Sequence, residues 1–168
     1  MLRPLDEADI TARYVAWFAD ADVTRFLEAR NLTADDSKAY LDAGRRSLSY
    51  FLYAICLRTS GRHIGNLKIG PIDWHHRVAD LVTVIGDKAL WGQGFASEAI
   101  ALGSRVAFES YGIRKLHGAI LAGNVGSIKA YLRGGWDIEG RLHAHRLIDG
   151  RATDMVLVSC LAPDGAAR

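Results

Sequence analysis

A short turn, Gly92-Gln93-Gly94, has the residue types and spacing that most directly imply chemistry. An apolar run rich in β-branched residues precedes it and predicts a strand, and the alanine-rich pattern of a helix follows at once. The first turn of a helix offers unpaired backbone N–H groups and a partial positive charge. A glycine turn at this place therefore predicts a phosphate or pyrophosphate site, since the missing Cβ lets the backbone approach an anion closely. A tight turn without a ligand is the alternative.

A second stretch runs from Asn124 to Trp136 and follows a strand-like segment, Leu116–Leu121. Asn124 is placed to cap a helix. Ser127 and Tyr131 are four residues apart, so they share one face of that helix. A free tyrosine hydroxyl keeps its proton at neutral pH because its pKa is about 10. Tyr131 also fits a plain structural role, as an amphipathic core residue with its hydroxyl at the rim.

Taken together, the two stretches resemble the GNAT superfamily of acyl-CoA-dependent N-acetyltransferases. The nine residues that begin at Trp91 are similar to its ribosomal-protein N-acetyltransferase-like (RimJ/RimL-type) branch. The second stretch matches the family pattern of Asn, then Ser or Ala, Tyr, and Gly before an aromatic residue. These positions are Asn124, Ser127, Tyr131, Gly135 and Trp136.

Two positions depart from the broader superfamily. The residue three before the first glycine is usually Arg or Gln and is Ala89 here, so the backbone amides must hold more of the phosphate. The aromatic residue after Gly135 is usually Phe and is Trp136 here. The resembled branch often lacks the Arg or Gln, and the aromatic exchange is tolerable.

The resemblance implies acetyl-CoA as cosubstrate and no metal, with the CoA pyrophosphate on the first turn and Tyr131 as the general acid that protonates the departing thiolate. It also implies that backbone groups of the strand before the turn pair with the pantetheine amides. The expected CoA-binding residues are Val84, Ile85, Gly86, Gly92, Gln93, Gly94, Phe95, Ala96, Ser97, Asn124, Ser127 and Arg133. An ordinary surface position is the alternative for Arg133.

The general base has two candidates, Asp80 and Glu28. Asp80 lies on the strand before the turn, and the alternative to a catalytic role is a charge at the edge of the sheet. Glu28 lies on a helical arm that helps form the acceptor site in the resembled family. His75 and His76 lie in a polar turn, where we expect them to be solvated, and His143 and His145 have no third ligand at metal spacing, so the sequence does not predict zinc. Either residue of the second pair could approach the amine, and a water-relayed base is a further alternative.

The function that we expect is direct transfer of an acetyl group to a primary amine within a ternary complex. Cys56 lies in the middle of an apolar strand, so nothing favours a covalent acyl-enzyme. The sequences of the segments 17–30 and 63–74 resemble those of family members that modify nucleotide-linked amino sugars. A protein N-terminus or an aminoglycoside is an alternative acceptor, and a non-catalytic acyl-CoA-binding module is an alternative of another class. Dinucleotide binding fails because its third glycine position is Ser97.

The 168 residues fit one domain, expected over 1–161, followed by a frayed tail over 162–168. A charge of +2 does not predict nucleic-acid binding, although it would not oppose an anionic cosubstrate. The apolar runs are too short to span a bilayer and no signal peptide is recognisable. Two separated cysteines suit a reducing compartment, so we expect a cytoplasmic protein. A homodimer through the C-terminal strands is compatible with the pattern.

The elements that must position these residues follow from periodicity and turn signals. A first strand over 1–5 precedes a helix capped by Asp6 or Asp9 and running to about Ala19, and a second helix begins at a capping box at Thr33. Three strands over 50–86 have tight turns and predict an antiparallel meander. A helix after Gly94, a strand over 115–122, a helix over 125–133 and two final strands complete the order β-α-α-β-β-β-α-β-α-β-β. The fold class is α+β, with a mixed, mainly antiparallel sheet like that of the GNAT fold and helices on both faces.

Overall fold

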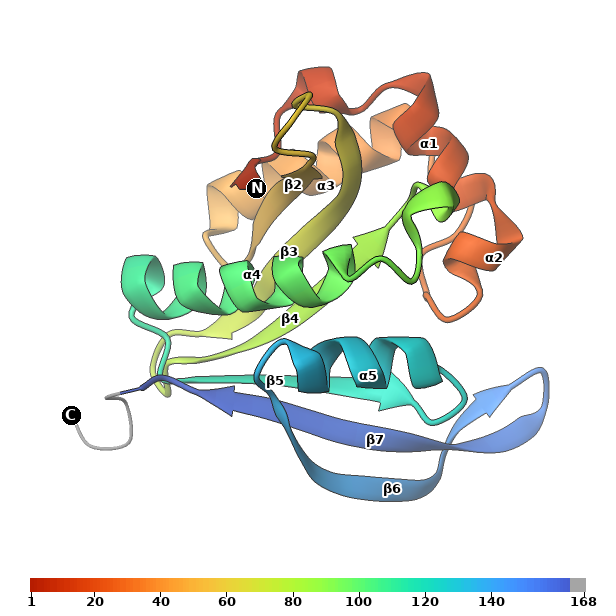
Figure 1. The fold of residues 1–168 in the computed structure, drawn as a ribbon, viewed down its shortest axis with the longest axis vertical. Helices are drawn as coiled ribbons and strands as arrows, with labels where there is room; N and C mark the ends of the chain where they lie inside the picture. Colours follow the sequence, from red (N-terminus) through yellow and green to blue (C-terminus); the bar gives the residue numbers. More distant parts are fainter. Residues whose placement is uncertain (164–168) are drawn as a thin grey trace.

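Seven strands form one mixed sheet in the computed structural model, which describes residues 1–163 (Figure 1). The strand order is β1-β2-β3-β4-β5-β7-β6, and the only parallel neighbours in this described part are β4 and β5. The bounds are Leu2–Pro4 for β1, Phe51–Cys56 for β2, His63–Asp73 for β3, Val78–Ile85 for β4, Lys115–Leu121 for β5, Asp137–Ile148 for β6 and Arg151–Leu161 for β7. The predicted mixed, mainly antiparallel sheet is confirmed. The predicted C-terminal tail falls mostly on 164–168, which lie outside the described residues.

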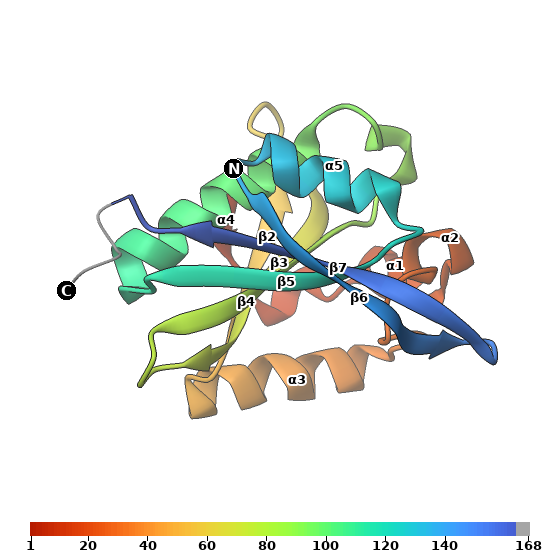
Figure 2. The same ribbon diagram turned by 90° about the horizontal axis from the view of Figure 1, so that it is seen from below.

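Helices cover both faces of the sheet, as Figure 2 shows from below. Their bounds are Glu7–Asp9 for the 3-10 helix η1, Ala12–Ala19 for α1, Ala21–Thr24 for α2, Ala34–Ser47 for α3, Lys88–Leu90 for the 3-10 helix η2, Phe95–Tyr111 for α4 and Val125–Arg133 for α5. The capping box predicted at Thr33 is present, with the Asp36 carboxylate bonded to the Thr33 N–H at 3.0 Å. Within residues 1–163 we find no helix that has both the length and the apolar character needed to span a membrane.

The single helix predicted up to Ala19 is wrong, because the chain breaks it at Ile10. Asp6 caps only the three-residue helix η1, and its partner in that capping box, Asp9, also binds the Arg3 guanidinium at 2.5 Å. Thr11 then starts a new helix by accepting the Tyr14 N–H at 3.4 Å. The caps at Asp6 and Thr11 thus start two separate helices where one was predicted.

Alternation along the strands divides the apolar side chains into two cores. On one face, Leu81 and Ile85 of β4 pack with α4 and α5 in a cluster that includes Ile100 and Tyr131. On the other face, Val84 packs with α1 and α3 around Trp17 and Leu41. Neighbouring residues of β4 therefore present side chains to opposite faces of the sheet.

Small residues bring α4 close to the sheet. A Cβ built on Gly103 would lie 2.5 Å from Leu67 Cδ1, so any larger residue would push the helix outward. The helix ends at Gly112 with φ +63°, a left-handed conformation that favours glycine. Close packing fixes the distance between the first turn of α4 and strand β4.

Strands β4 and β5 separate where the candidate site lies. They pair only from Val78 to Asp80 against Lys115 to His117, and both strands then continue past this ladder. In Figure 1 the two strands diverge, with the first turn of α4 and helix α5 beside the divergence. The divergence leaves edge-facing backbone of β4 available for contacts other than strand pairing.

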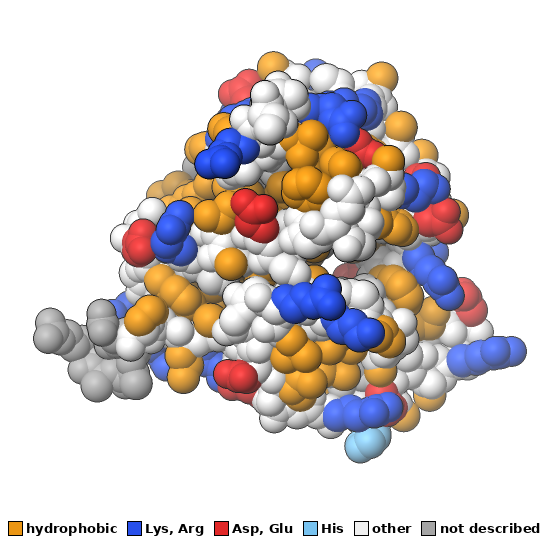
Figure 3. All heavy atoms as spheres, in the orientation of Figure 1, with side chains coloured by type: hydrophobic (Ala, Val, Ile, Leu, Met, Phe, Trp, Pro, Cys, Tyr) orange, Lys and Arg blue, Asp and Glu red, His pale blue; other side chains and the backbone are white. Residues whose placement is uncertain are grey.

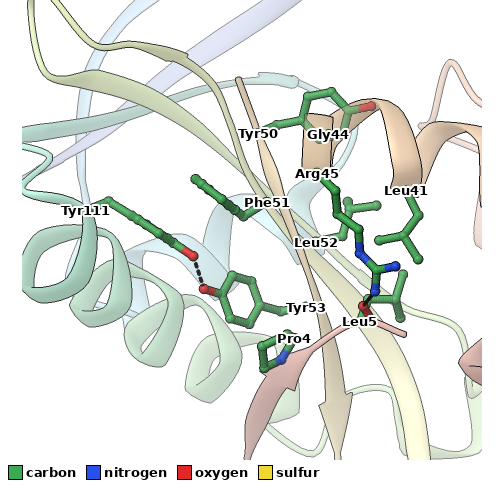
Figure 4. A pocket seen from close by; sticks show the side chains of 10 residues that line it. All are labelled: Pro4, Leu5, Leu41, Gly44, Arg45, Tyr50, Phe51, Leu52, Tyr53 and Tyr111. Carbon is green, nitrogen blue, oxygen red and sulfur yellow. Dashed lines mark hydrogen bonds between the residues drawn. The ribbon is translucent and has the colours of Figure 1, made fainter. Parts of the chain in front are cut away.

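A separate hollow of about 160 Å³ lies at the other end of α4 (Figure 4). Phe51 and Tyr111 stack there with ring centroids 4.2 Å apart, and the hydroxyls of Tyr53 and Tyr111 are hydrogen-bonded. Tyr111 ends α4, and a helix of that length spans about 25 Å at 1.5 Å per residue. This aromatic hollow is therefore remote from the glycine turn.

Candidate active site

The glycine turn has the geometry of an anion site. Gly92 and Gly94 have φ of +74° and +87°, which L side chains rarely adopt, and Gly94 caps α4 without any side-chain bond to the first turn. A Cβ on either glycine would meet no atom within 4 Å, so the space above the turn is open. The unpaired N–H groups of the first turn, contributed by Phe95, Ala96 and Ser97, thus face a space that an anion can enter.

Three side chains make contacts that the sequence did not predict and that hold this turn in place. The Trp91 indole N–H donates to the Ile85 carbonyl at 2.8 Å and ties the turn to β4. Lys88 binds Asp20 at 2.7 Å and Asp22 at 2.9 Å, which joins η2 to the start of α2. The Gln93 side chain donates back to the Ala89 carbonyl at 2.8 Å, so the backbone of Gln93 is the part left for a ligand.

The backbone groups of β4 that face the gap belong to odd-numbered residues. The Leu81 carbonyl accepts from Tyr131 and the Ile85 carbonyl accepts from Trp91, both from the gap side. The Gly86 N–H instead bonds to the Ile64 carbonyl of β3 at 2.9 Å. Because alternate residues direct their backbone groups to opposite neighbours, Val84 also faces β3. The backbone groups of Val84 and Gly86 therefore face β3, whereas those of Thr83 and Ile85 face the gap, so the pantetheine contacts predicted for this stretch stay a prediction.

Tyr131 reaches the floor of the gap from α5. The side chain is buried, and its hydroxyl donates to the Leu81 carbonyl at 2.5 Å. The Trp136 ring makes an edge contact with the Tyr131 ring, with the ring centroids 4.8 Å apart. The Trp136 indole N–H in turn donates to the Ser104 hydroxyl at 2.9 Å. Burial raises the pKa of Tyr131, and the nearby Asp80 carboxylate adds to this effect. The phenol therefore holds its proton throughout the neutral range.

The other predicted residues of the second stretch have simpler positions. The Asn124 side chain caps α5 by accepting the Ser127 N–H at 3.2 Å, which is the structural role that the sequence suggested. Ser127 is half-buried on the first turn of α5, one turn before Tyr131. Arg133 is exposed at the last turn of the helix. Asn124 thus has a definite structural role, while Arg133 has no described contact that fixes its direction.

Asp80 lies in the interior of the sheet, so the edge-charge alternative is wrong. It stands opposite His117 in the only parallel ladder of the described residues, and it lies on the face opposite that of Leu81 and Tyr131. Burial raises the pKa of the Asp80 carboxyl, an effect only partly offset by the charges of His117 and Lys68. A carboxylate with a raised pKa is a better base than an exposed one. The sequence could not show this burial because strand order is a tertiary property.

Glu28 lies on the surface arm between α2 and α3. Its side chain is 87% exposed and binds Arg146 of the β6–β7 hairpin at 3.4 Å. The hairpin and the arm therefore meet, and both lie near α2 in Figures 1 and 2. His143 lies 3.3 Å from Asp154, and His76 lies 3.0 Å from Asp73 in the β3–β4 turn. These geometries favour Asp80 over Glu28 and over the histidines as a base.

Comparisons with known proteins agree with this site. A model of the acetyltransferase (GNAT) domain matches residues 1–137. A curated relative, the uncharacterized N-acetyltransferase p20 of Bacillus licheniformis, is 24% identical over 161 residues that cover 94% of this chain and 88% of the relative.

Two similar solved structures share the fold at low identity. The Vibrio cholerae spermidine N-acetyltransferase in complex with CoA and spermine has a TM-score of 0.85 at 18% identity, covering 96% of this chain and 94% of its own. The Vibrio fischeri ribosomal-protein-S5-alanine acetyltransferase has a TM-score of 0.79 at 17% identity, covering 98% of this chain and 93% of its own. The predicted GNAT-like fold is confirmed.

Proposed function

The chain belongs to the GNAT acetyltransferase family and is an acetyl-CoA-dependent N-acetyltransferase, and on this premise we propose that its acceptor is a primary amine that also carries an anion, with nucleotide-linked amino sugars as the favoured class. The observation that carries this proposal is the charge of the two segments that meet beside the gap. The arm has two arginines, Arg25 and Arg30, against Glu28. The hairpin has Arg141, Arg146 and Arg151, with Asp149 as the one acidic residue between them.

Several of these arginines are available to an incoming anion. Arg25, Arg30 and Arg151 are exposed, and Arg30 donates only to backbone carbonyls among the described contacts. Arg141 is bound to Asp154 at 2.7 Å, so it contributes less. Figure 3 shows Lys and Arg side chains on this side of the surface, with Asp and Glu side chains among them. A basic rim attracts a diphosphate-linked amine and repels a polyamine or an aminoglycoside.

The chemical roles that we propose follow from the two faces of β4. Asp80, on the face of α1 and α3, accepts the proton of the acceptor amine. Tyr131, on the face of α4 and α5, donates its proton to the departing thiolate. The gap between β4 and β5 connects the two sides, so the amine attacks from one face while the thiol leaves by the other. Cys56 is buried in β2 and takes no part, which fits direct transfer.

The turn and α5 bind the cosubstrate in this proposal. The backbone N–H groups of Gly92 to Ser97 hold the pyrophosphate, which fits the open space above glycines without Cβ atoms. The gap-facing groups of Thr83 and Ile85 pair with the pantetheine amides. Ser127 faces the same region from α5. Acetyl-CoA supplies the activated acetyl group, and these residues orient it.

Thiol release across a matched panel of amines tests the acceptor. The panel contains a UDP-linked amino sugar, the same free amino sugar, a peptide with a free N-terminus, spermidine and an aminoglycoside. We expect the nucleotide-linked amine to have the highest kcat/KM, and Arg25→Glu or Arg151→Glu to raise its KM about 10-fold at low salt. Arg105→Glu, which makes the same charge change on the exposed side of α4, is the control. Equal kcat/KM for spermidine would overturn the anionic-amine proposal.

A further inference from the structure

The Tyr131 hydroxyl has a partner that suits it only while it keeps its proton. It donates to the Leu81 carbonyl, and the whole side chain is buried. When the phenol gives its proton away, an oxygen with negative charge remains beside a carbonyl oxygen. Two acceptors at hydrogen-bond distance repel each other, and this repulsion is strong where water is excluded. Proton transfer from Tyr131 therefore needs another donor close to the phenol oxygen.

Thr83 carries a buried hydroxyl on the same stretch of β4. Its Oγ1 is buried and has no hydrogen-bond partner within the described residues. Thr83 follows Leu81 by two residues on β4, so both side chains lie on the face that Tyr131 contacts. Burial and the Asp80 charge raise the pKa of Tyr131, and the Thr83 hydroxyl lowers it by a smaller amount.

A buried hydroxyl without a partner is costly, so this position asks for an explanation. Valine has almost the same shape and would satisfy the packing against Leu67 opposite it in β3 without the cost of a buried hydroxyl. A threonine gains an advantage when a charged acceptor forms next to it, because hydrogen bonds to ions are about twice as strong as neutral ones.

We propose that Thr83 is a positioning residue that acts through Tyr131, by donating its hydroxyl proton in a hydrogen bond to the phenolate that forms as the thiol leaves. This inference rests on the proposed role of Tyr131 as general acid. In the step, the bond between the amine nitrogen and the acetyl carbon forms, and the carbon–sulfur bond breaks with its electron pair on sulfur. The phenol proton moves to sulfur and Asp80 takes the proton lost by the amine; after the products leave, Asp80 gives that proton to solvent and the phenolate takes one from solvent.

Thr83→Val and Thr83→Ser test the proposal. Valine keeps the shape and removes the donor, so we expect kcat to fall about 10- to 100-fold with little change in the KM for acetyl-CoA. Serine keeps the donor, so we expect it to restore kcat to within about threefold of the wild type. Thermal melting of both variants shows whether each is folded, and the serine variant remains informative if the valine variant is not.

A double-mutant cycle with Tyr131→Phe separates the two levels of the account. If Thr83 acts through the phenol, Thr83→Val has no further effect on kcat in the Tyr131→Phe background. If Tyr131→Phe itself keeps full activity, the proposed role of Tyr131 fails. If Tyr131→Phe is slow and Thr83→Val is as fast as the wild type, the inference about Thr83 alone fails. A rise in the KM for acetyl-CoA with unchanged kcat would assign Thr83 to cosubstrate binding and would also overturn the inference.

Discussion

Replacing Tyr131 with phenylalanine removes one oxygen and should lower both activity and stability. The structure gives a separate reason for each loss. A general acid contributes about 10²- to 10⁴-fold to a rate, so we expect kcat to fall within that range with the KM for acetyl-CoA nearly unchanged. The ring stays in place because its edge contact with Trp136 at 4.8 Å does not involve the hydroxyl.

The stability cost of this change comes from the carbonyl that it leaves behind. The Tyr131 hydroxyl donates to the Leu81 carbonyl at 2.5 Å, in a place that solvent does not reach. An unsatisfied buried acceptor costs about 1–3 kcal/mol. A chain of 168 residues loses about 2–4 °C of melting temperature per kcal/mol, so the variant remains folded for assay at 25 °C.

Tyr50→Phe is the matched control. The Tyr50 hydroxyl also donates to a backbone carbonyl, that of Tyr40, at 2.6 Å, but it lies at the remote aromatic hollow (Figure 4). Tyr50→Phe should keep full activity, with a smaller loss of stability because its bond is exposed. Thiol release at saturating acetyl-CoA and thermal denaturation give both numbers for each variant. A Tyr131→Phe variant that turns over as fast as Tyr50→Phe would refute the role of Tyr131 as general acid.

Changes at two further positions test the base and the cap of α5. Asp80→Asn should reduce kcat about 10²-fold or more, since the amide cannot take the amine proton. The same change should raise the melting temperature at pH 7. The pKa of Asp80 is raised in the folded state, so the ionisation of this carboxyl opposes folding as the pH rises. In acid, where Asp80 is protonated in both states, the difference in melting temperature from the wild type should vanish. A variant that is less stable than wild type at pH 7 would contradict this. Asn124→Ala should lower stability by about 1 kcal/mol through loss of the cap, whereas Asn124→Asp keeps the cap; a KM for acetyl-CoA raised by both changes would indicate a pantetheine contact.

Local sequence signals predicted most of the elements correctly. The capping box at Thr33 and the bounds of α5 depend on interactions within a few residues, and each is present in the structure. The helix before Ala19 was predicted wrongly because Asp6 and Thr11 are both good caps, and the choice between one helix and two depends on the contact of Asp9 with Arg3.

The parts of the site that could not be predicted depend on strand order and direction. The burial of Asp80 requires β5 beside β4, and the gap-facing backbone of Thr83 requires the pairing of β4 with β3. The tight turn between β3 and β4 predicted the second pairing, but neither its register nor the pairing of β4 with β5 leaves a mark in a single sequence. The contacts of Trp91 and Lys88 span the turn and two other elements, so they too became visible only in the folded chain.

Calorimetric binding of acetyl-CoA to the wild type, Gly94→Trp and Gly61→Trp tests the central claim most directly. Both glycines have positive φ and open space where a Cβ would lie, so the two substitutions impose similar strain, but Gly61 is in the β2–β3 turn. Binding by the wild type and by Gly61→Trp, with binding lost in Gly94→Trp, is the result that the account predicts. Equal binding by all three proteins would place the pyrophosphate elsewhere and would contradict the proposed site.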